Sequence, residues 1–351
     1  MKSKCFALFL TCAIGLGSLL VSFPAPATAK TWTLKVSVEM PEMSPLVSKG
    51  LKPWAKEVAR ATNGQVKVVI YPSGTLCHVG EMLDAVESGI ADAGLAWPGL
   101  HKGFAPLSMV GSLPMQFELA EVGGQAMWEL YTKSPAIQAE FKDFHLLTTW
   151  ATDAYFFMSR TDKKIRTVED LKGMKIRAAN AATAAFYKRL GAVPVMMRMP
   201  DVYLGLQKGT LDGTSAQGEA ITGFKFYEVI KSYTKPGMIP GTHILIMNKG
   251  MWNSMPSDVQ QQLMSVSGGV LSKKMGRNVF DAATRDFPKH AFNRGAAFDI
   301  IYLPKDEVAR FKKIGADPVE KGWVKDNTAK GLPAAKVLAD FKKLVKKYQM
   351  Q

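Results

Sequence analysis

The sequence predicts an α/β protein built of two lobes. Three observations support this: β-rich segments alternate with amphipathic helical segments, the chain is long enough for two cores, and one short motif occurs twice. Alternating strands and helices are typical of a sheet with helices packed on its faces. We therefore expect each lobe to hold its own sheet, the first of them largely parallel.

The N-terminus has the pattern of a secretory signal peptide. Lys2 and Lys4 precede an apolar run from Cys5 to Val21, and Ala27 and Ala29 place small residues before a cleavage point. This pattern predicts cleavage after Ala29 and export to the periplasm. A retained membrane anchor is the alternative, but a helix-breaking PAPA segment follows the run directly. Cleavage would leave 322 of the 351 residues, enough for two domains.

The composition is basic, with a formal net charge of +15 that falls to +13 once Lys2 and Lys4 are removed. Such a balance is compatible with nucleic acid, an acidic surface or anionic ligands. Export argues against nucleic acid, and the lysines are spread along the polar faces of helical patterns. We therefore expect a solvated basic surface that mildly attracts anions.

Two strand and helix pairs are expected in the first lobe. Alternation from Thr33 to Val38 predicts a strand, and apolar residues at helical spacing from Val47 to Val58 predict a helix. A second strand is expected from Val66 to Tyr71, followed by a helix from Val79 to Ser88 that Gly89 closes.

The second lobe repeats this order. We expect strands at Lys175 to Ala178 and Val193 to Met196, and helices at Ala181 to Leu190 and Pro200 to Lys208. The segment from Gly89 to Gly94 recurs weakly as Gly209 to Gly213, each time after a helix. This repeated motif indicates two related lobes.

The C-terminal third is mostly helical. A strand is expected from His243 to Asn248, and a helical pattern runs from Ser257 to about Phe292, with Gly268, Gly269 and Pro288 as points where it bends. A helix of that length would act as a spine for both lobes. A last helix, beginning after Pro333, covers the surface.

Several segments together resemble the periplasmic substrate-binding component of a tripartite ATP-independent periplasmic (TRAP) transporter. Each segment is weak alone, but their order and spacing are specific. The segments are Tyr71–Leu76, Glu87–Gly94, Leu113–Phe117, Leu171–Gly213, Met247–Lys249 with Trp252, and Pro256–Leu263.

The resemblance implies a two-lobed, type II-like periplasmic binding protein fold with crossing hinge strands and a spine helix. It places residues 30–153 and 243–282 in the first lobe, and residues 154–242 and 283–351 in the second. The KGxKxR pattern of the family stands here as Lys172 to Arg177, so Arg177 is the expected partner of a ligand carboxylate. A planar guanidinium that stays charged suits that role. The alternative is that Arg177 pairs with a structural Asp or Glu.

Two departures from the family pattern narrow the expected ligand. The segment Ala154–Met158 lacks the second polar group that many relatives have, and Thr214–Gln217 replaces their Gln-Glu-Asn. Both changes remove polarity from the pocket. We therefore expect a monocarboxylate with an apolar or aromatic body rather than a dicarboxylate or sugar acid.

Aromatic and polar side chains near the predicted strand ends are further candidates for ligand contact. Flat rings bury flat ligands at a low entropic cost. Each candidate could equally be a core or solvated residue. The aromatic candidates are Trp97, Phe117, Trp150, Tyr155 and Phe157, and the polar candidates are Asn180, Gln217 and Glu219.

The sequence has no pattern of a metal site, a cofactor loop or a serine hydrolase. Cys77 beside His78 is the one nucleophile-like pair, but adjacent residues point apart. Three hypotheses remain: a TRAP binding protein that serves membrane subunits, a binding protein of an ABC-type importer or sensor, and a secreted enzyme using Cys77 or Glu219. The genes beside this one would separate the first two.

Overall fold

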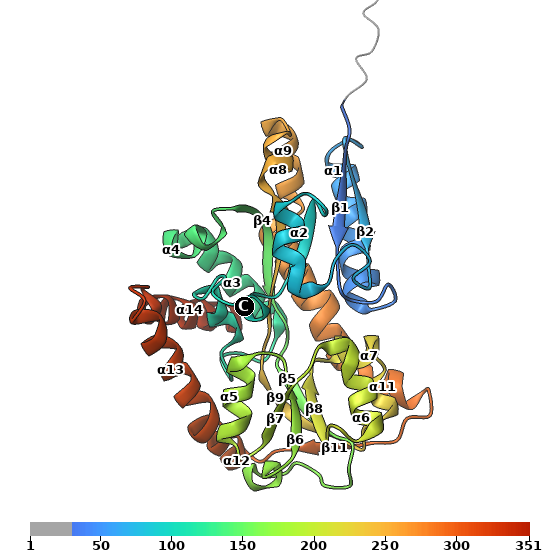
Figure 1. Ribbon diagram of the computed structural model, residues 1–351, viewed down its shortest axis with the longest axis vertical. Helices are drawn as coiled ribbons and strands as arrows, with labels where there is room; N and C mark the ends of the chain where they lie inside the picture. The colour runs from blue at the N-terminus through green and yellow to red at the C-terminus, as the bar shows by residue number, and fades with distance from the viewer. Residues whose placement is uncertain (1–29) are drawn as a thin grey trace, which may run out of the picture. The chain divides into compact units, whose positions relative to one another are not determined.

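Two sheets, each with helices packed around it, make up the computed structural model, which describes residues 30–351 (Figure 1). The signal peptide and its cleavage after Ala29 lie outside the described residues. Within residues 30–351, none of the helices has the length and hydropathy needed to cross a membrane.

The first sheet has five strands in the order β2-β1-β3-β10-β4. β1 is parallel to β2 and β3, whereas β10 is antiparallel to β3 and β4. β4 therefore runs in the same direction as β1, β2 and β3. The prediction of a largely parallel sheet is correct for these four strands and wrong for β10, because β10 enters this sheet from the second one. The bounds are β1 (Trp32–Ser37), β2 (Val66–Tyr71), β3 (Ala93–Ala96), β4 (Phe144–Ala151) and β10 (Thr242–Asn248).

The second sheet has six strands in the order β11-β9-β5-β8-β6-β7. β6 is parallel to β7 and β8, and β5 is antiparallel to its two neighbours. The bounds are β5 (Tyr155–Ser159), β6 (Lys175–Ala178), β7 (Val193–Met196), β8 (Gly213–Ala216), β9 (Ser232–Ile239) and β11 (Asp299–Tyr302).

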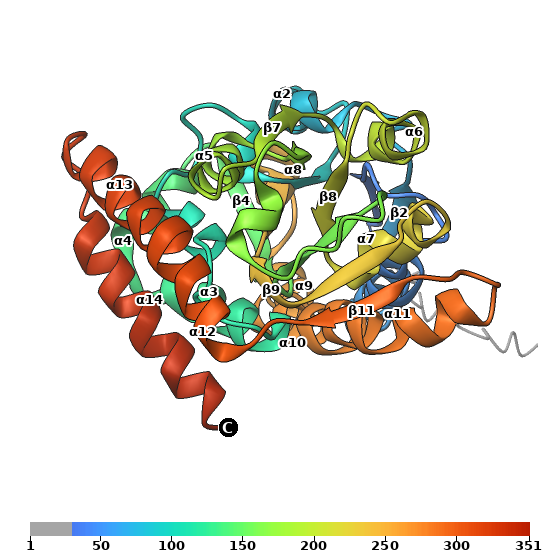
Figure 2. The same ribbon diagram turned by 90° about the horizontal axis from the view of Figure 1, so that it is seen from below.

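Helices cover both sheets, and the last of them run along one side of the molecule (Figures 1 and 2). α14 packs against α3, whereas α13 contacts α5. The helices near the first sheet are α1 (Lys52–Ala61), α2 (Met82–Glu87), α3 (Ala120–Lys133), α4 (Pro135–Gln138), α8 (Lys249–Asn253) and α9 (Ser257–Ser265). The others are α5 (Ala181–Arg189), α6 (Val202–Lys208), α7 (Gly218–Gly223), α12 (Lys305–Phe311), α13 (Asp317–Thr328) and α14 (Ala334–Gln349).

The chain crosses twice between the sheets as extended backbone, once between β4 and β5 and once between β9 and β10. The two crossings are tied together: the Thr152 nitrogen donates to the Gly241 oxygen at 2.8 Å, and the Gly241 nitrogen donates to Thr152 Oγ1 at 2.8 Å. The Tyr155 side chain fills the space beside Gly241, where a Cβ would lie 2.3 Å from the Tyr155 hydroxyl. The crossing strands of the prediction are therefore present as a bonded pair.

The expected spine helix is shorter than its sequence pattern. The helix that begins at Ser257 ends at Ser265, and a new one starts at Gly268, which has a φ of +49°. From there α10 (Gly268–Lys274), a π-helical segment η9 (Met275–Asp281) and α11 (Ala282–Phe292) follow without interruption. At about 1.5 Å per residue this element is nearly 40 Å long. It contacts β4 through α10 and α7 through α11, so it reaches from one sheet to the other.

The repeated motif has the same structural role beside both sheets. In the first, Asp92 Oδ2 accepts from the Lys35 nitrogen at 2.8 Å, and the Asp92 nitrogen donates to the Lys35 oxygen at 2.9 Å. In the second, Asp212 and Lys175 form the same two bonds, each at 2.9 Å. Each aspartate therefore binds the backbone of one strand residue on both sides, Lys35 within β1 and Lys175 at the start of β6.

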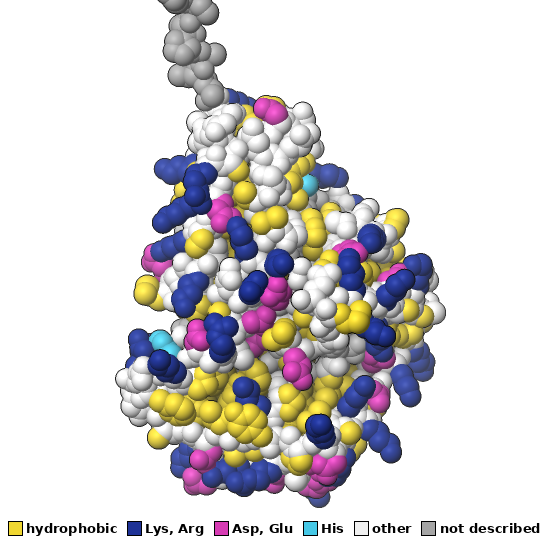
Figure 3. All heavy atoms as spheres, turned by 180° about the vertical axis from the view of Figure 1, so that it is seen from behind, with side chains coloured by type: hydrophobic (Ala, Val, Ile, Leu, Met, Phe, Trp, Pro, Cys, Tyr) yellow, Lys and Arg dark blue, Asp and Glu magenta, His cyan; other side chains and the backbone are white. Residues whose placement is uncertain are grey.

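Charged side chains are interspersed over the surface. Figure 3 shows Lys and Arg scattered among Asp and Glu on one face, with no continuous basic area. Fourteen ion pairs between the described residues include exposed pairs such as Lys52 with Glu42. This distribution matches the expected solvated basic surface.

Gly213 in β8 tests how tightly the second sheet is packed. A Cβ there would lie 2.4 Å from the Met158 backbone oxygen, which cannot move without disturbing β5. We expect Gly213→Ala to lower the free energy of unfolding by about 1–3 kcal/mol, measured by denaturant titration. Gly80→Ala is the control, because nothing lies within 4 Å of a Cβ at that position. Equal stability of the two variants would contradict this packing.

Candidate ligand-binding site

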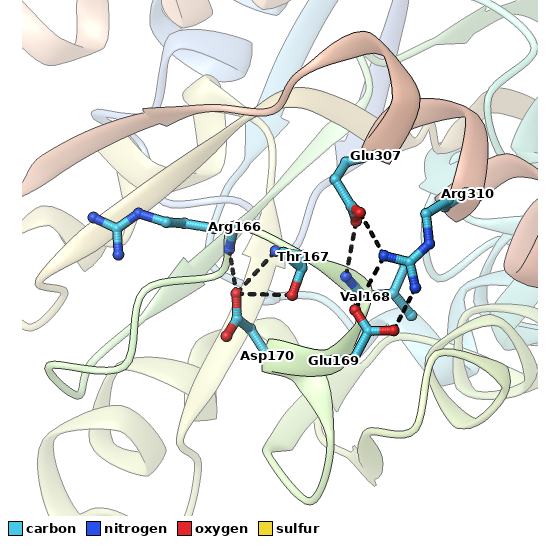
Figure 4. Close-up of polar contacts among 7 residues, drawn as sticks. All are labelled: Arg166, Thr167, Val168, Glu169, Asp170, Glu307 and Arg310. Carbon is cyan, nitrogen blue, oxygen red and sulfur yellow. Dashed lines mark hydrogen bonds and ion pairs between the residues drawn. The ribbon is translucent and has the colours of Figure 1, made fainter.

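The segment that leads into β6 is anchored at its first turn (Figure 4). A 3₁₀ turn, η6 (Val168–Leu171), begins with a capping box in which Asp170 Oδ2 accepts from the nitrogens of Arg166 and Thr167, each at 2.8 Å. Such a box satisfies donors that the helix start leaves free. The turn is therefore locally defined by its own sequence.

Helix α12 holds the same turn from the outside, as the close-up shows (Figure 4). Glu307 Oε2 accepts from the Val168 nitrogen at 3.2 Å, and Arg310 forms ion pairs with both Glu169 and Glu307. A guanidinium between two carboxylates makes a geometrically specific contact. The strand that carries Arg177 is therefore fixed upstream by a distant part of the chain.

Arg177 is a buried cation without an ion pair. Its side chain lies on β6, the residue is 2% exposed, and Nε donates to the Met197 oxygen at 2.9 Å. Within residues 30–351 its two terminal nitrogens have neither a hydrogen bond nor a carboxylate within 4.0 Å. Burial lowers the pKa of Arg177, and the nearby Tyr155, Tyr187 and Glu39 oppose that change. The side chain is held at one end, and the other end is available to an anion.

Arg177 lies between two adjoining chambers that share part of their walls. The narrow chamber has a volume of about 40 Å³ and the wide chamber about 230 Å³. Residues common to both are Trp97, Leu100, Arg177, Ala179 and Met199. The narrow chamber also includes Tyr155, Asn180, Thr183, Gly241 and His243, and the wide one includes Glu39, Val79, Met196 and Arg198. The two chambers form one site with the guanidinium at their junction.

Asn180 combines a structural role with a place in the cavity. Its Oδ1 caps helix α5 by accepting from the Thr183 nitrogen at 2.9 Å. This bond orients the amide so that Nδ2 lies on the side of Gly99, where a Cβ would come within 2.7 Å of it. Asn180 and Gly99 line the narrow chamber together with Arg177, so the Nδ2 donor is a candidate for ligand contact.

Trp97 and His243 form the aromatic wall of the narrow chamber, with ring centroids 5.2 Å apart. Burial lowers the pKa of His243 to about 3, so the imidazole is neutral. Trp150 is fully buried and meets His243 edge-on at 5.7 Å. Trp150 thus supports the wall from behind and does not line the chamber.

The remaining predicted residues lie outside the two chambers. Phe157 packs against Tyr187 and Phe311, and Phe117 packs against Phe341. Gln217 and Glu219 are buried beyond β8 and line neither chamber. Of the nine predicted residues, the structure brings Arg177, Trp97, Tyr155 and Asn180 together. The ligand contacts of all nine stay predictions.

Sequence reasoning did not single out Glu39, His243, Met199 or Thr183. Glu39 follows β1 closely, as Arg177 lies near the end of β6, so the repeated motif carried a signal for it. His243 and Thr183 had no local signal, because their contact with the cavity depends on how β10 and α5 meet the first sheet.

Cys77 and His78 do not form a reactive pair. The Cys77 Sγ is buried 3.3 Å from Ser37 Oγ and 3.7 Å from Met82 Sδ, while His78 is exposed. Within residues 30–351 there is also no cluster of side chains able to hold a metal ion.

Comparison with known proteins identifies the family. The model of a family described as bacterial extracellular solute-binding protein, family 7, matches residues 37–322. The chain belongs to this family. The C4-dicarboxylate-binding periplasmic protein DctP of Rhodobacter capsulatus is 27% identical over 322 residues, covering 87% of this chain and 94% of that protein.

Two solved structures resemble this family 7 protein over nearly their whole length. One is a TRAP solute-binding protein from Rhodoferax ferrireducens with copurified benzoate, with a TM-score of 0.85, 27% identity, and coverage of 91% of this chain and 99% of that one. The other, from a marine metagenome, is described as specific for aromatic acid ligands and contains 3-hydroxybenzoate. Its TM-score is 0.84, with 27% identity and coverage of 91% and 99%. The family and fold place this chain among periplasmic TRAP solute-binding proteins.

Two carboxyl groups of the family 7 protein, Glu219 on α7 and Asp153 between β4 and β5, are buried. Glu219 Oε1 accepts from the Leu46 nitrogen at 3.2 Å, and its Oε2 has no partner among the described residues. Burial raises the pKa of Glu219 to about 7, and hydrogen bonds from Leu46 and Ser44 oppose the rise. The neighbouring Asp153 is likewise buried, and burial raises its pKa well above the usual value.

Glu219 is expected to make stability fall as pH rises. The pKa of Glu219 is raised from 4.5 to about 7 on folding, so between these pH values the folded protein binds more protons than the unfolded chain. The contribution of Glu219 to the free energy of unfolding is therefore fully present below pH 4.5 and is lost as the pH rises to about 7. At about 1.4 kcal/mol per pKa unit the loss is on the order of 3 kcal/mol. Glu219→Gln should remove this part of the pH dependence, measured by denaturant titration at pH 4.5 and pH 8. An unchanged pH profile in the variant would contradict the raised pKa.

Proposed function

We propose that this protein captures a small monocarboxylate with an aromatic or apolar body and delivers it to the membrane subunits of a TRAP transporter. The observation that carries the proposal is the buried guanidinium of Arg177, which faces a cavity and has no anionic partner within 4.0 Å among the described residues. A buried charge of this kind is unfavourable unless a counter-charge reaches it. A ligand carboxylate supplies that charge.

The chemistry of the narrow chamber favours one carboxylate. Arg177 is the sole permanently charged side chain lining it within residues 30–351, and Asn180 Nδ2 adds a neutral donor. A planar guanidinium binds a carboxylate through two parallel N–H···O bonds, and low local dielectric strengthens them. A second carboxylate in the same chamber would meet no further cation.

The walls favour a flat apolar body. Trp97 and Met199 line both chambers, and Met196 and Val79 line the wide one. Aromatic and thioether side chains bury flat rings well. The benzoate and 3-hydroxybenzoate found in the two solved relatives are compounds of this class.

We infer further that the ligand is bound without chemical turnover. Cys77 faces Ser37 and Met82 in the core, and Glu219 is hydrogen bonded to Leu46 outside the chambers. Neither of these two candidate catalytic groups therefore lines a chamber with Arg177. Incubation of the purified protein with aromatic acids should return them unchanged; turnover lost in Cys77→Ser would favour the enzyme hypothesis instead.

Replacement of Arg177 should abolish ligand binding and leave the fold intact. Loss of two charge-assisted hydrogen bonds corresponds to about 3 kcal/mol, or roughly 100-fold in affinity. We expect Arg177→Ala to lose at least that much affinity for benzoate in isothermal titration calorimetry, and Arg177→Lys to recover only part of it.

Arg189→Ala is the matched control, because Arg189 is exposed at the end of α5 on the same sheet. Circular dichroism and thermal melting establish that all three variants are folded. Tight binding of the acid by folded Arg177→Ala would remove the proposal.

A further inference from the structure

The wide chamber contains a second ionisable group, the half-buried carboxyl of Glu39, that the proposed function does not use. Glu39 lines this chamber, and its Oε2 is buried without a hydrogen-bond partner among the described residues. Arg177 lines the same chamber, yet the two side chains form no ion pair within 4.0 Å. A cation and an anion thus face one cavity, and neither is satisfied by the other.

The pseudo-symmetry of the two sheets explains this placement. Asp92 and Asp212 fix Lys35 of β1 and Lys175 of β6 by the same two bonds, so the two strands correspond. Glu39 follows Lys35 at the same spacing in the sequence as Ala179 follows Lys175, so Glu39 and Ala179 occupy equivalent positions. Both residues line the wide chamber. Equivalent positions of the two sheets therefore approach the cavity, and the first sheet places a carboxylate there.

We propose that Glu39 is a specificity-determining residue that accepts a hydrogen bond from a hydroxyl group on the ligand, at the end of the molecule away from its carboxylate. This inference rests on the proposed function, because the carboxylate of the same ligand binds Arg177. An unpaired buried acceptor is unfavourable, so a ligand that supplies a donor is selected over one that lacks it.

The charges around Glu39 favour a neutral donor over an ammonium group. Arg198 also lines the wide chamber. The pKa of Glu39 responds to the charges of four neighbours, which are Arg198, Arg177, His78 and Asp201. Burial raises the pKa of Glu39, and the two arginines and His78 act against that rise. An added cation would be repelled by the guanidinium groups of Arg177 and Arg198, which line the same chamber, whereas a hydroxyl has no such penalty. The ligand class is therefore a hydroxylated aromatic monocarboxylate.

The test measures the affinities of a series of related acids for the wild-type protein and for two variants by isothermal titration calorimetry. The acids are benzoate, 3-hydroxybenzoate and 4-hydroxybenzoate, with 3-(aminomethyl)benzoate as the ammonium probe. We expect the wild-type protein to bind one hydroxybenzoate about tenfold more tightly than benzoate, and the ammonium compound no better than benzoate.

Glu39→Met keeps the length of the side chain and removes the acceptor. It should reduce the preference for the hydroxybenzoate to within about twofold, with affinity for benzoate kept or improved. Glu81→Met is the control, because Glu81 is exposed on the turn that follows His78. It should retain the wild-type preference.

Three results would overturn the assignment of Glu39: equal binding of all the acids by wild type, a preference retained in folded Glu39→Met, or an equal gain in affinity for all acids in that variant. The last would mean that Glu39 acts as a competing anion for Arg177. In each case benzoate still binds through Arg177 and the proposed function stands. Failure of the folded wild-type protein to bind any of the acids would remove both proposals.

Discussion

The binding site depends on a guanidinium that is buried without a carboxylate partner. Moving a charge out of water costs several kcal/mol even after relaxation, so a position like that of Arg177 persists only if the surrounding structure fixes it. Here the Met197 oxygen holds Nε, the capping box at Thr167 fixes the approach to β6, and α12 ties that approach to a distant segment. The stability of these contacts keeps the charge at the cavity in the absence of ligand.

Much of the fold could be predicted because its signals are local. The strands at Val66–Tyr71, Lys175–Ala178 and Val193–Met196 agree with the structure to the residue. The failures come from tertiary context. The pattern from Ser257 to Phe292 is helical in period, but Trp128 packs over Gly268 and Gly269, and the chain breaks just before them. The antiparallel β10 could not be inferred, because its direction depends on the crossing from the other sheet.

Part of the candidate site could also be predicted, because the sequence signals for some of its residues are local. Arg177 was marked by a pattern within six residues, and Asn180 lies just beyond β6. Trp150 and Phe157 resemble Trp97 in sequence terms, yet both lie on strands whose side chains turn into the cores. Alternation along a strand assigns two faces, but it does not say which face meets a cavity and which meets a helix. Glu39 was missed for a different reason. Its proposed role as an acceptor for the ligand is inferred from the correspondence between β1 and β6, and the residues next to it in the sequence give no such signal.

The bonded crossings at Thr152 and Gly241 have a mechanical consequence. Because each crossing donates a hydrogen bond to the other, the two connections are coupled and would bend together if one sheet rotated against the other. Tyr155, Thr242 and His243 lie on the strands next to these crossings and also line the narrow chamber. A ligand bound through Arg177 would therefore lie beside the hinge, where a small difference in its thickness produces a large displacement at the outer ends of the molecule.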